Sequence, residues 1–515
     1  MRSKKTQSLI RVLLVLGILV VVNFISVRVF GRLDLTKERV YTLSDASKRL
    51  VGSLDDRLTV KAYFTEDLPA PYNSNRRAVL DILNDYRAYS KGNLQFEFIN
   101  PQGQKGEEEA QQQGIPPAQV NVVKEDKLEV VRAYLGLVFL YEDKKEVLPV
   151  IQNLSSLEYD ISSTIKRLTT VTKKKIGYTT GHQEPTLQNL QRANQELSKQ
   201  YNLEPVDLSK NAPIPTDLAA LLVIAPASKF NDSSKFAIDQ YLMAGGKVAF
   251  LLNTINANLQ QRFAQPVNLG IQDMLENYGV RLNSDLVRDA QCANITVSQM
   301  QGPFQIRSQI PFPYFPSPSD FNRSNSIVKD LQSLMLFFVS SVDTSPAASK
   351  GLKAEVLIRS SKRSGRQTGE FMMIDPFQRY AAADLPESSI PLAAIVSGSF
   401  KSFFAGKEPA PALTQSPETR ILVVGDGDFI KDEYLGDRGN LTFFQNLVDY
   451  LADDAGLITI RSKDIAQPPL EQVSDGTKKM LKYANIVIPP LLIVGYGLFR
   501  WRRRVALKKS LESQL

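Results

Sequence analysis

Two uncharged apolar segments near the ends of this 515-residue chain limit what it can fold into. Residues 12–27 carry no charge, and if Arg11 and Arg28 reach toward the polar headgroups, the apolar stretch extends over residues 9–30. The second segment, residues 483–499, is likewise uncharged. A helix that crosses the hydrocarbon core of a bilayer needs about 20 apolar residues, with a lower limit of about 17. We therefore expect one transmembrane helix at each end of the chain.

The first segment has an alternative interpretation as a cleaved signal peptide. Such peptides end in a cleavage site that is built from small residues. The corresponding region of this chain instead holds Asn23, Phe24, Arg28, Phe30 and Arg32. The sequence therefore favours an uncleaved anchor.

Aromatic residues and prolines add detail to the second segment. Tyr483 and Trp501 are 18 positions apart, which is about 27 Å along a helix and places the two rings near the two interfaces of a bilayer. Pro489 and Pro490 lie between them, where each removes a backbone hydrogen bond. Packing against partner helices would help to compensate for that loss, so the prolines are a candidate docking site. A kinked, solitary anchor is an equally good interpretation.

The distribution of the net charge of +8 argues against binding to nucleic acid. The first 11 residues contribute +4 and residues 478–515 contribute +8, so the rest of the chain carries −4. A body of this charge lacks the basic surface that phosphate binding requires. Because basic residues mark the cytoplasmic side of membrane helices, we expect both termini in the cytoplasm of a bacterium. The anchors would lie in its inner membrane and the bulk of the chain on the periplasmic side.

Residues 31–172 have the pattern of a small α/β domain. Ser44 is a suitable N-cap for a short helix, and two strands of alternating hydrophobicity, 58–64 and 94–100, flank an amphipathic helix. A proline-bearing turn, a β-hairpin and a helix at 157–168 follow. This order is similar to that of the thioredoxin fold.

Redox chemistry is excluded for this thioredoxin-like domain. Residues 65–68 read Thr-Glu-Asp-Leu after the first strand, where a thioredoxin carries Cys-x-x-Cys. Cys292 is the only cysteine of the chain, so neither thiol exchange within this domain nor an intrachain disulfide can occur. We expect a binding or structural derivative of the fold.

Residues 173–465 alternate strands and helices in the manner of a doubly wound, flavodoxin-like α/β domain. The strands at 219–227 and 247–253 are almost continuously apolar, which is typical of a largely parallel sheet covered on both faces. A proline-rich stretch at 310–321 interrupts the pattern, and we expect an irregular insertion at about 254–390. Strands near 391–398 and 420–429 should return to the same sheet.

These expectations divide the chain into consecutive parts. They are a cytoplasmic N-terminus (1–8), transmembrane helix 1 (9–30), the thioredoxin-like domain (31–172), the doubly wound domain (173–465), a linker (466–482), transmembrane helix 2 (483–499) and a basic cytoplasmic tail (500–515).

His182 is the only histidine, which excludes a metal site with several imidazoles. It lies in Gly-His-Gln-Glu after a strand, where doubly wound folds place binding residues, and Glu184 is two positions further on. These two residues are candidates for contact with a ligand or partner. The alternative, which we favour, is a turn capped by polar side chains.

Asp426 and Asp428 follow another apolar strand, in Gly-Asp-Gly-Asp-Phe. Alternating carboxylates at this position, with Asp432 and Glu433 nearby, suit a hard cation such as Ca²⁺ or Mg²⁺. Glycine and aspartate are also what a tight strand-to-helix turn prefers, and this structural interpretation is favoured. No P-loop motif occurs in the sequence, so the chain is not expected to hydrolyse ATP in that way, and we assign it no cofactor, catalytic residue or metal site.

Four segments in order resemble the GldG-like gliding-motility family of ABC-transporter auxiliary proteins. They are DLTKERVYTLSDASKRLV (34–51), TTGHQEP (179–185), QYLMAGGKVAFLLN (240–253) and the stretch from Val423 to Lys463. The sequence GHQE departs from the GHGE expected for the family. The resemblance implies a protein that works beside an ABC permease and its cytoplasmic ATPase.

We therefore expect a membrane-anchored, non-enzymatic auxiliary subunit of an ABC-type transport or gliding system. Its partners would be the permease, the ATPase and membrane lipid, and its large extracytoplasmic part would bind a substrate, another envelope protein or a glycan. One alternative is an envelope hydrolase or amidase with its site at GHQE or GDGDF, although the sequence offers no evident nucleophile. Another is a purely structural tether across the periplasm.

Overall fold

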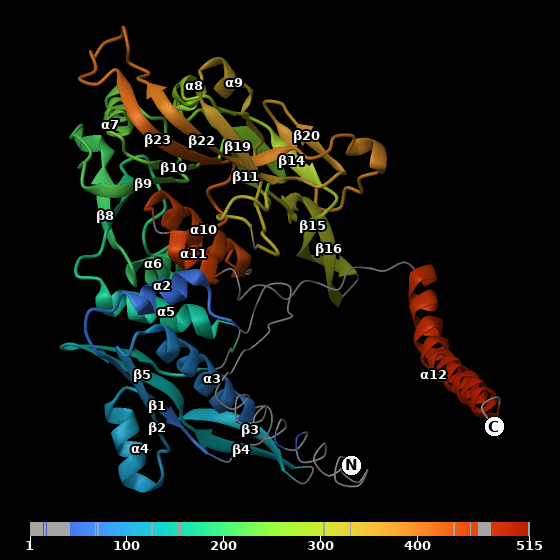
Figure 1. Ribbon diagram of the computed structural model, residues 1–515. Coiled ribbons are helices and arrows are strands. Elements are labelled where there is room, and N and C mark those ends of the chain that lie inside the picture. The colour runs from blue at the N-terminus through green and yellow to red at the C-terminus, as the bar shows by residue number, and fades with distance from the viewer. Residues whose placement is uncertain are drawn as a thin grey trace. The chain divides into compact units, whose positions relative to one another are not determined.

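The computed structural model forms two compact units, residues 1–466 and 467–515, which are described separately (Figure 1). The expected first anchor at 9–30 lies outside the described residues apart from Leu14 and Gly17, and so does the part of the expected linker at 466–474. The described residues are 14, 17, 42–66, 68, 72–124, 127–151, 154, 156–301, 304–329, 331–435, 438–453, 455–461 and 475–512.

The N-terminal domain is built on a four-stranded sheet in the order β2-β1-β5-β6. Strand β1 pairs in parallel with β2 and antiparallel with β5, which pairs antiparallel with β6. The β-α-β unit, the hairpin and the closing helix are confirmed, whereas the thioredoxin-like assignment stays a prediction. The elements are α2 (Asp45–Gly52), β1 (Leu58–Phe64), α3 (Asn73–Tyr89), β2 (Leu94–Ile99), α4 (Gly103–Gln112), β3 (Ala118–Lys124), β4 (Lys127–Ala133), β5 (Leu135–Tyr141), β6 (Lys144–Leu148) and α5 (Leu157–Thr169).

The cap of α2 agrees with the sequence prediction, whereas one pair of strands was not predicted. Ser44 caps α2 as expected, since its hydroxyl accepts a hydrogen bond from the backbone N–H of Ser47 at 3.1 Å. The separate antiparallel pair β3–β4 had no counterpart in the sequence prediction. It occupies the segment between the polar helix α4 and the buried strand β5.

The second domain contains an eight-stranded sheet in the order β17-β19-β22-β23-β10-β9-β7-β8. Strands β8, β7, β9, β10 and β23 are mutually parallel, and β22, β19 and β17 continue the sheet antiparallel. The parallel strands follow the 2-1-3-4-5 order of a doubly wound sheet. Its elements include β7 (Lys175–Thr180), α6 (Gln191–Ser198), β8 (Asn202–Asp207), η1 (Leu208–Lys210), β9 (Leu218–Ile224), α7 (Asp232–Met243), β10 (Val248–Leu251), β22 (Pro391–Lys401), β23 (Gln415–Val424), α10 (Arg438–Leu451) and α11 (Ala455–Arg461).

Both faces of this sheet are buried, which explains the continuous apolar strands. Leu222 and Ile224 of β9 pack in one core with α6 and α10, while Leu221 and Val223 pack in the opposite core with α7 and α8. Alternate residues of a strand point to opposite faces, so a strand covered on both sides must be apolar throughout. The return of β22 and β23 to this sheet is confirmed.

The stretch expected as an irregular insertion, 254–390, contains eleven of the described strands, β11 to β21. It contributes β17 and β19 to the main sheet and forms small sheets of its own, including the long hairpin β15–β16. Most of its strands are short, and pairs such as β14–β20 join distant segments, so they leave little local signal. The elements are β11 (Ile255–Asn258), β12 (Phe263–Pro266), α8 (Gln272–Asn277), β13 (Arg281–Leu282), β14 (Leu286–Asp289), β15 (Cys292–Gln301), β16 (Phe304–Pro316), β17 (Asp320–Phe321), β18 (Val342–Asp343), α9 (Ser345–Ser349), β19 (Lys353–Arg359), β20 (Ser364–Gln367), β21 (Met372–Met373) and η2 (Ala382–Asp384).

A buried arginine joins the end of the second domain to the first. Arg461, at the end of α11, is 5% exposed. Its guanidinium pairs with Asp449 of α10 at 2.9 Å and donates hydrogen bonds to Asn446 at 2.6 Å and to the hydroxyl of Tyr159 in α5 at 2.9 Å. It also lies 4.8 Å from the centre of the Tyr159 ring. Helices α10, α11 and α5 are therefore held by one polar cluster.

The C-terminal unit is the single helix α12 (Asp475–Glu512). Its segment Lys482–Val505 is, among the described helices, the one long and apolar enough to cross a membrane. Pro489 and Pro490 lie inside this helix, and its apolar side chains, such as Leu492 and Ile493, are exposed in the chain alone. Such a surface is consistent with a membrane anchor at this end, and both the anchoring and the orientation of the helix stay predictions.

Candidate functional site

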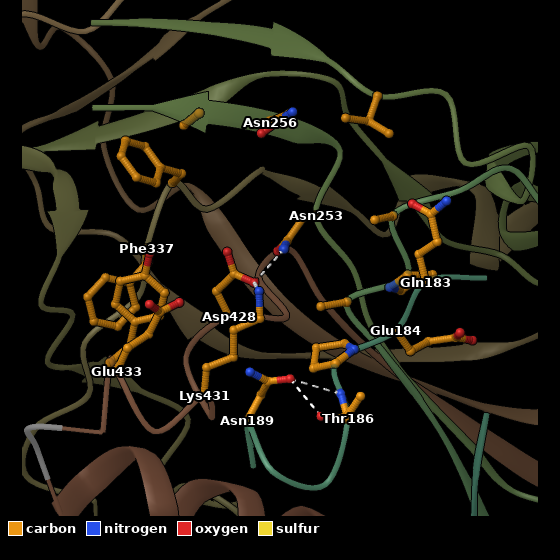
Figure 2. Close-up of a pocket in the computed structure, with 18 of the residues that line it drawn as sticks. Gln183, Glu184, Thr186, Asn189, Asn253, Asn256, Phe337, Asp428, Lys431 and Glu433 are labelled. Carbon is orange, nitrogen blue, oxygen red and sulfur yellow. Dashed lines mark hydrogen bonds and ion pairs between the residues drawn. The ribbon is translucent and has the colours of Figure 1, made fainter. Parts of the chain in front are cut away.

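A pocket of about 610 Å³ opens at the carboxyl ends of the parallel strands (Figure 2). Its walls are the segments that follow β7, β9, β10 and β23, together with Phe337 and Phe338. Doubly wound sheets bind ligands at this edge, next to the point where the strand order reverses, which here lies between β7 and β9. We call it the strand-end pocket. Of the candidate residues from the sequence, Glu184 and Asp428 line it, whereas His182 and Asp426 lie behind its walls.

His182 is a packing residue of the loop after β7. Its ring is buried and stacks on Phe230 with a centroid distance of 4.1 Å and an interplanar angle of 13°. Its carbonyl oxygen accepts hydrogen bonds from the backbone N–H groups of Ala227 and Ser228, which joins this loop to the one after β9. Burial lowers the pKa of His182, against the opposing effect of the Glu184 and Asp207 charges, so we expect a neutral ring at neutral pH.

Glu184 caps the turn that contains His182. Its Oε2 atom accepts the backbone N–H of His182 at 2.6 Å, and its Oε1 atom lies 3.9 Å from His182 Nδ1. Among the described residues, neither Oε1 nor Nδ1 has a hydrogen-bond partner. Figure 2 shows the carboxylate turned away from Asp428. The geometry fits the polar-capped turn better than a catalytic pair.

The glycines of the Gly-Asp-Gly-Asp segment are required by close backbone contacts. A Cβ atom at position 425 would overlap the carbonyl oxygen of Ser340, and one at position 427 would lie 2.6 Å from the carbonyl oxygen of Leu251. Gly425 also accepts a hydrogen bond from the backbone N–H of Ser340 at 2.8 Å. These contacts bring the segment before β18 and the end of β10 against the end of β23.

Asp426 is fully buried and positions the wall of the pocket. Its carboxylate accepts hydrogen bonds from the backbone N–H groups of Phe337 at 2.7 Å and Asp428 at 2.6 Å. Burial, together with the charge of Asp428, raises its pKa to about 8, although the backbone donors act in the opposite direction. In the part of the chain that the structure describes, no group of three or more His, Cys, Asp or Glu side chains suits a metal ion. The geometry favours the structural role for Asp426.

Asp428 has a different environment, because it reaches the pocket. Its Oδ1 atom accepts a hydrogen bond from Asn253 at 2.8 Å and lies 2.6 Å from the ammonium of Lys431. Asn253 in turn accepts the backbone N–H of Gly427 at 2.7 Å. The loops after β10 and β23 are therefore connected directly beneath the pocket.

Three residues other than glycine line the pocket in the left-handed backbone region. The φ angles are 60° at Gln183, 42° at Ala225 and 50° at Phe338. Such conformations cost on the order of 1 kcal/mol or more each and tend to gather at functional sites. Their concentration around one cavity supports its assignment as a binding site.

The sequence prediction missed Asn253, Phe337 and Lys431 as pocket residues, whereas Asp432 and Glu433 were noted beside Asp428. Asn253 had a usable signal, because it lies two residues after the end of the apolar strand β10. Phe337 had none, since its segment reads as an apolar stretch and reaches the pocket only through the long-range bond to Asp426.

Replacing Asp426 by asparagine is expected to weaken the dependence of stability on pH. The native state holds the Asp426 proton up to about pH 8, whereas the unfolded chain loses it at about pH 4. Between these values a rise in pH ionises the unfolded chain first and so favours unfolding. Urea titrations at several pH values between about 5 and 8 should show the wild-type free energy of unfolding falling relative to that of Asp426→Asn. Parallel profiles would contradict a raised pKa at this position.

Comparisons with known proteins agree with the extent of the second domain. The family described as an ABC-type uncharacterized transport system matches residues 173–454, and a domain of unknown function matches residues 37–140. An uncharacterized protein of Borreliella burgdorferi is 24% identical over 98% of this chain and 99% of its own length.

Two solved structures show distant likeness and bear on neither fold nor function. The mmIFT52 N-terminal domain has a TM-score of 0.34 and 14% identity, and it is matched over 54% of this chain and 96% of its own. An exo-beta-1,4-mannosidase, Op5Man5 from Opitutaceae bacterium strain TAV5, has a TM-score of 0.22 and 9% identity, over 60% of this chain and 39% of its own. The family match covers more than half of the sequence, and this chain therefore belongs to the ABC-type uncharacterized transport system family.

Proposed function

We propose that this chain is a membrane-anchored auxiliary subunit of an ABC-type transport system and that its strand-end pocket binds a substrate or an envelope partner. The observation that carries the proposal is the pocket itself, at the strand ends of the domain that defines the family. The chain would be anchored in the bacterial inner membrane with both termini in the cytoplasm. The two α/β domains would then face the periplasm.

The subunit is proposed to be non-enzymatic. The sequence lacks a P-loop, so energy from ATP would come from a separate ATPase subunit that acts with a permease. In the described part of the pocket, polar side chains serve mainly to hold loops together, as Asp428 and Glu184 do. This arrangement suits recognition of a ligand better than chemical conversion.

Helix α12 is the proposed contact with the permease. Its apolar side chains are exposed in the chain alone, and Pro489 and Pro490 interrupt its backbone hydrogen bonds within the candidate span. Neighbouring helices in a membrane can re-satisfy backbone groups freed by proline. A permease helix packed beside the two prolines would provide such a neighbour.

Affinity purification of the full chain in mild detergent should recover a permease and an ATPase. The double variant Pro489→Ala, Pro490→Ala should still fractionate with membranes but recover about threefold less permease, because interhelical packing is worth on the order of 1 kcal/mol. The matched control is Leu491→Ala, Leu492→Ala, which keeps both prolines and should retain most of the permease. Recovery of a solitary chain in several detergents would contradict the proposed complex.

A further inference from the structure

Three backbone N–H groups near this edge of the sheet are already bonded to side chains of the chain. Asp432 accepts the N–H groups of Gln191 at 2.7 Å and Arg192 at 3.1 Å, at the start of α6. The N–H of Gly427 is likewise bonded to Asn253. Helix starts and glycine-rich turns after parallel strands are the usual anion sites of doubly wound folds. At the start of α6 a carboxylate of the chain itself takes that position, which disfavours phosphate and nucleotide ligands there.

The charged groups of the pocket are mostly negative. The carboxylates of Asp428, Asp432 and Glu433 belong to the described lining, and Lys431 is its cation, whereas the Glu184 carboxylate is buried in its own turn. The Lys431 ammonium is 2.6 Å from Asp428, so its charge is locally balanced. Glu433 is exposed and Asp428 is partly exposed, and both come from the loop after β23. A cleft lined by one sign of charge concentrates ions of the opposite sign.

Aromatic rings stand beside these carboxylates. The Tyr434 ring packs against Phe337 with a centroid distance of 4.4 Å and an interplanar angle of 33°, and Tyr434 and Phe338 are both partly exposed at the pocket wall. Burial, reinforced by the charges of Glu433, Asp428 and Asp426, raises the pKa of Tyr434 to about 12. The faces of aromatic rings attract ammonium groups, and more strongly where water is partly excluded.

We propose that the strand-end pocket binds a ligand through a positively charged amine, such as a lysine side chain or a free amino group, and rejects anions. This inference rests on the proposed function and specifies its ligand. Glu433 and the free side of Asp428 would receive the ammonium, with Tyr434 and Phe338 against its alkyl stem. Lys431 already places an ammonium on Asp428 and so acts as an internal competitor for the same carboxylate.

Calorimetric titration of the full chain in detergent tests the amine specificity of the pocket. Trilysine amide is the cationic probe, and triglutamate and inorganic phosphate are the anionic probes. We expect binding of trilysine amide alone. Glu433→Gln should weaken it by about two- to fivefold, the range for one partly exposed ion pair. Lys431→Gln should strengthen it by a similar factor, because the competitor is removed. The matched control is Glu418→Gln, an exposed carboxylate of β23 outside the pocket lining, which should leave affinity unchanged.

Equal effects of the Glu433 and Glu418 substitutions would overturn the proposal, because the probe would then be reading general surface charge. Binding of phosphate or triglutamate would also overturn the proposal, and so would a failure of trilysine amide to bind. If the probe fails while the permease and ATPase still co-purify, the amine specificity is wrong and the auxiliary function stands. If co-purification fails while trilysine amide binds as expected, the proposed auxiliary function is wrong and the amine specificity of the pocket stands.

Discussion

Replacing Arg461 by methionine is expected to lower the free energy of unfolding by about 3–5 kcal/mol. Asp449 is 1% exposed, and the substitution leaves its carboxylate in the interior without the Arg461 cation. The hydrogen bonds from Arg461 to Asn446 and Tyr159 are lost as well. Methionine retains much of the side-chain volume, so the loss is mainly electrostatic. Urea unfolding of the full chain in detergent, followed by circular dichroism, gives the free-energy difference.

Two comparison variants identify the cause of that loss. Arg281→Gln removes an exposed pair with Glu276 and should cost at most about 1 kcal/mol. Asp449→Asn, added to Arg461→Met, should recover part of the lost stability because the interior charge is gone. If the double variant is no more stable than Arg461→Met, packing rather than charge determines the effect.

Replacing Gly425 by alanine is expected to destabilise the second domain by on the order of 3 kcal/mol or more. The new Cβ would overlap the carbonyl oxygen of Ser340, and the two backbones would have to separate. The Ser340–Gly425 hydrogen bond of 2.8 Å would be lost in the process. Because Asp426 is the next residue, the bond that positions Phe337 at the pocket would be disturbed too. Thermal unfolding should show the loss of stability, and trilysine amide binding should show the damage to the pocket.

Gly456→Ala serves as the control for the glycine substitution. A Cβ at this position in α11 meets only Ala46, at 3.9 Å, among the described atoms. Alanine is favoured over glycine inside a helix by about 1 kcal/mol. Stability should therefore be unchanged or slightly higher. A similar loss at positions 425 and 456 would refute the role of the close Ser340 contact.

The elements that the sequence predicted well are those with a local signal. Strands β9 and β10 are continuous apolar runs between amphipathic helices, and α2 begins at the Ser44 cap as expected. The β3–β4 pair and the strands within 254–390 were not predicted. Some of these pairs, such as β14 with β20, join distant segments, and a single sequence does not encode such contacts in its periodicity. Others, such as β3–β4 and β15–β16, are local hairpins that the sequence analysis did not recognise.

The candidate site was predicted in location but not in detail. The rule that ligands bind at strand ends indicated the loops that hold Glu184 and Asp428, and both line the pocket. It could not distinguish them from His182 and Asp426, because residues one or two positions apart in a turn face in different directions. Here the stacking on Phe230 and the bond to Phe337 turn those two side chains inward.

The buried position of Arg461 has a mechanical consequence. It is the last described residue before the chain continues to α12. Tension applied along that connection would act first on α11 and on the charge cluster that joins it to α10 and α5. Asn440, in α10, is bonded to Met335 and Phe429, on either side of the pocket wall. The load would therefore be shared between the two domains, with the strand-end pocket at the far end of α10.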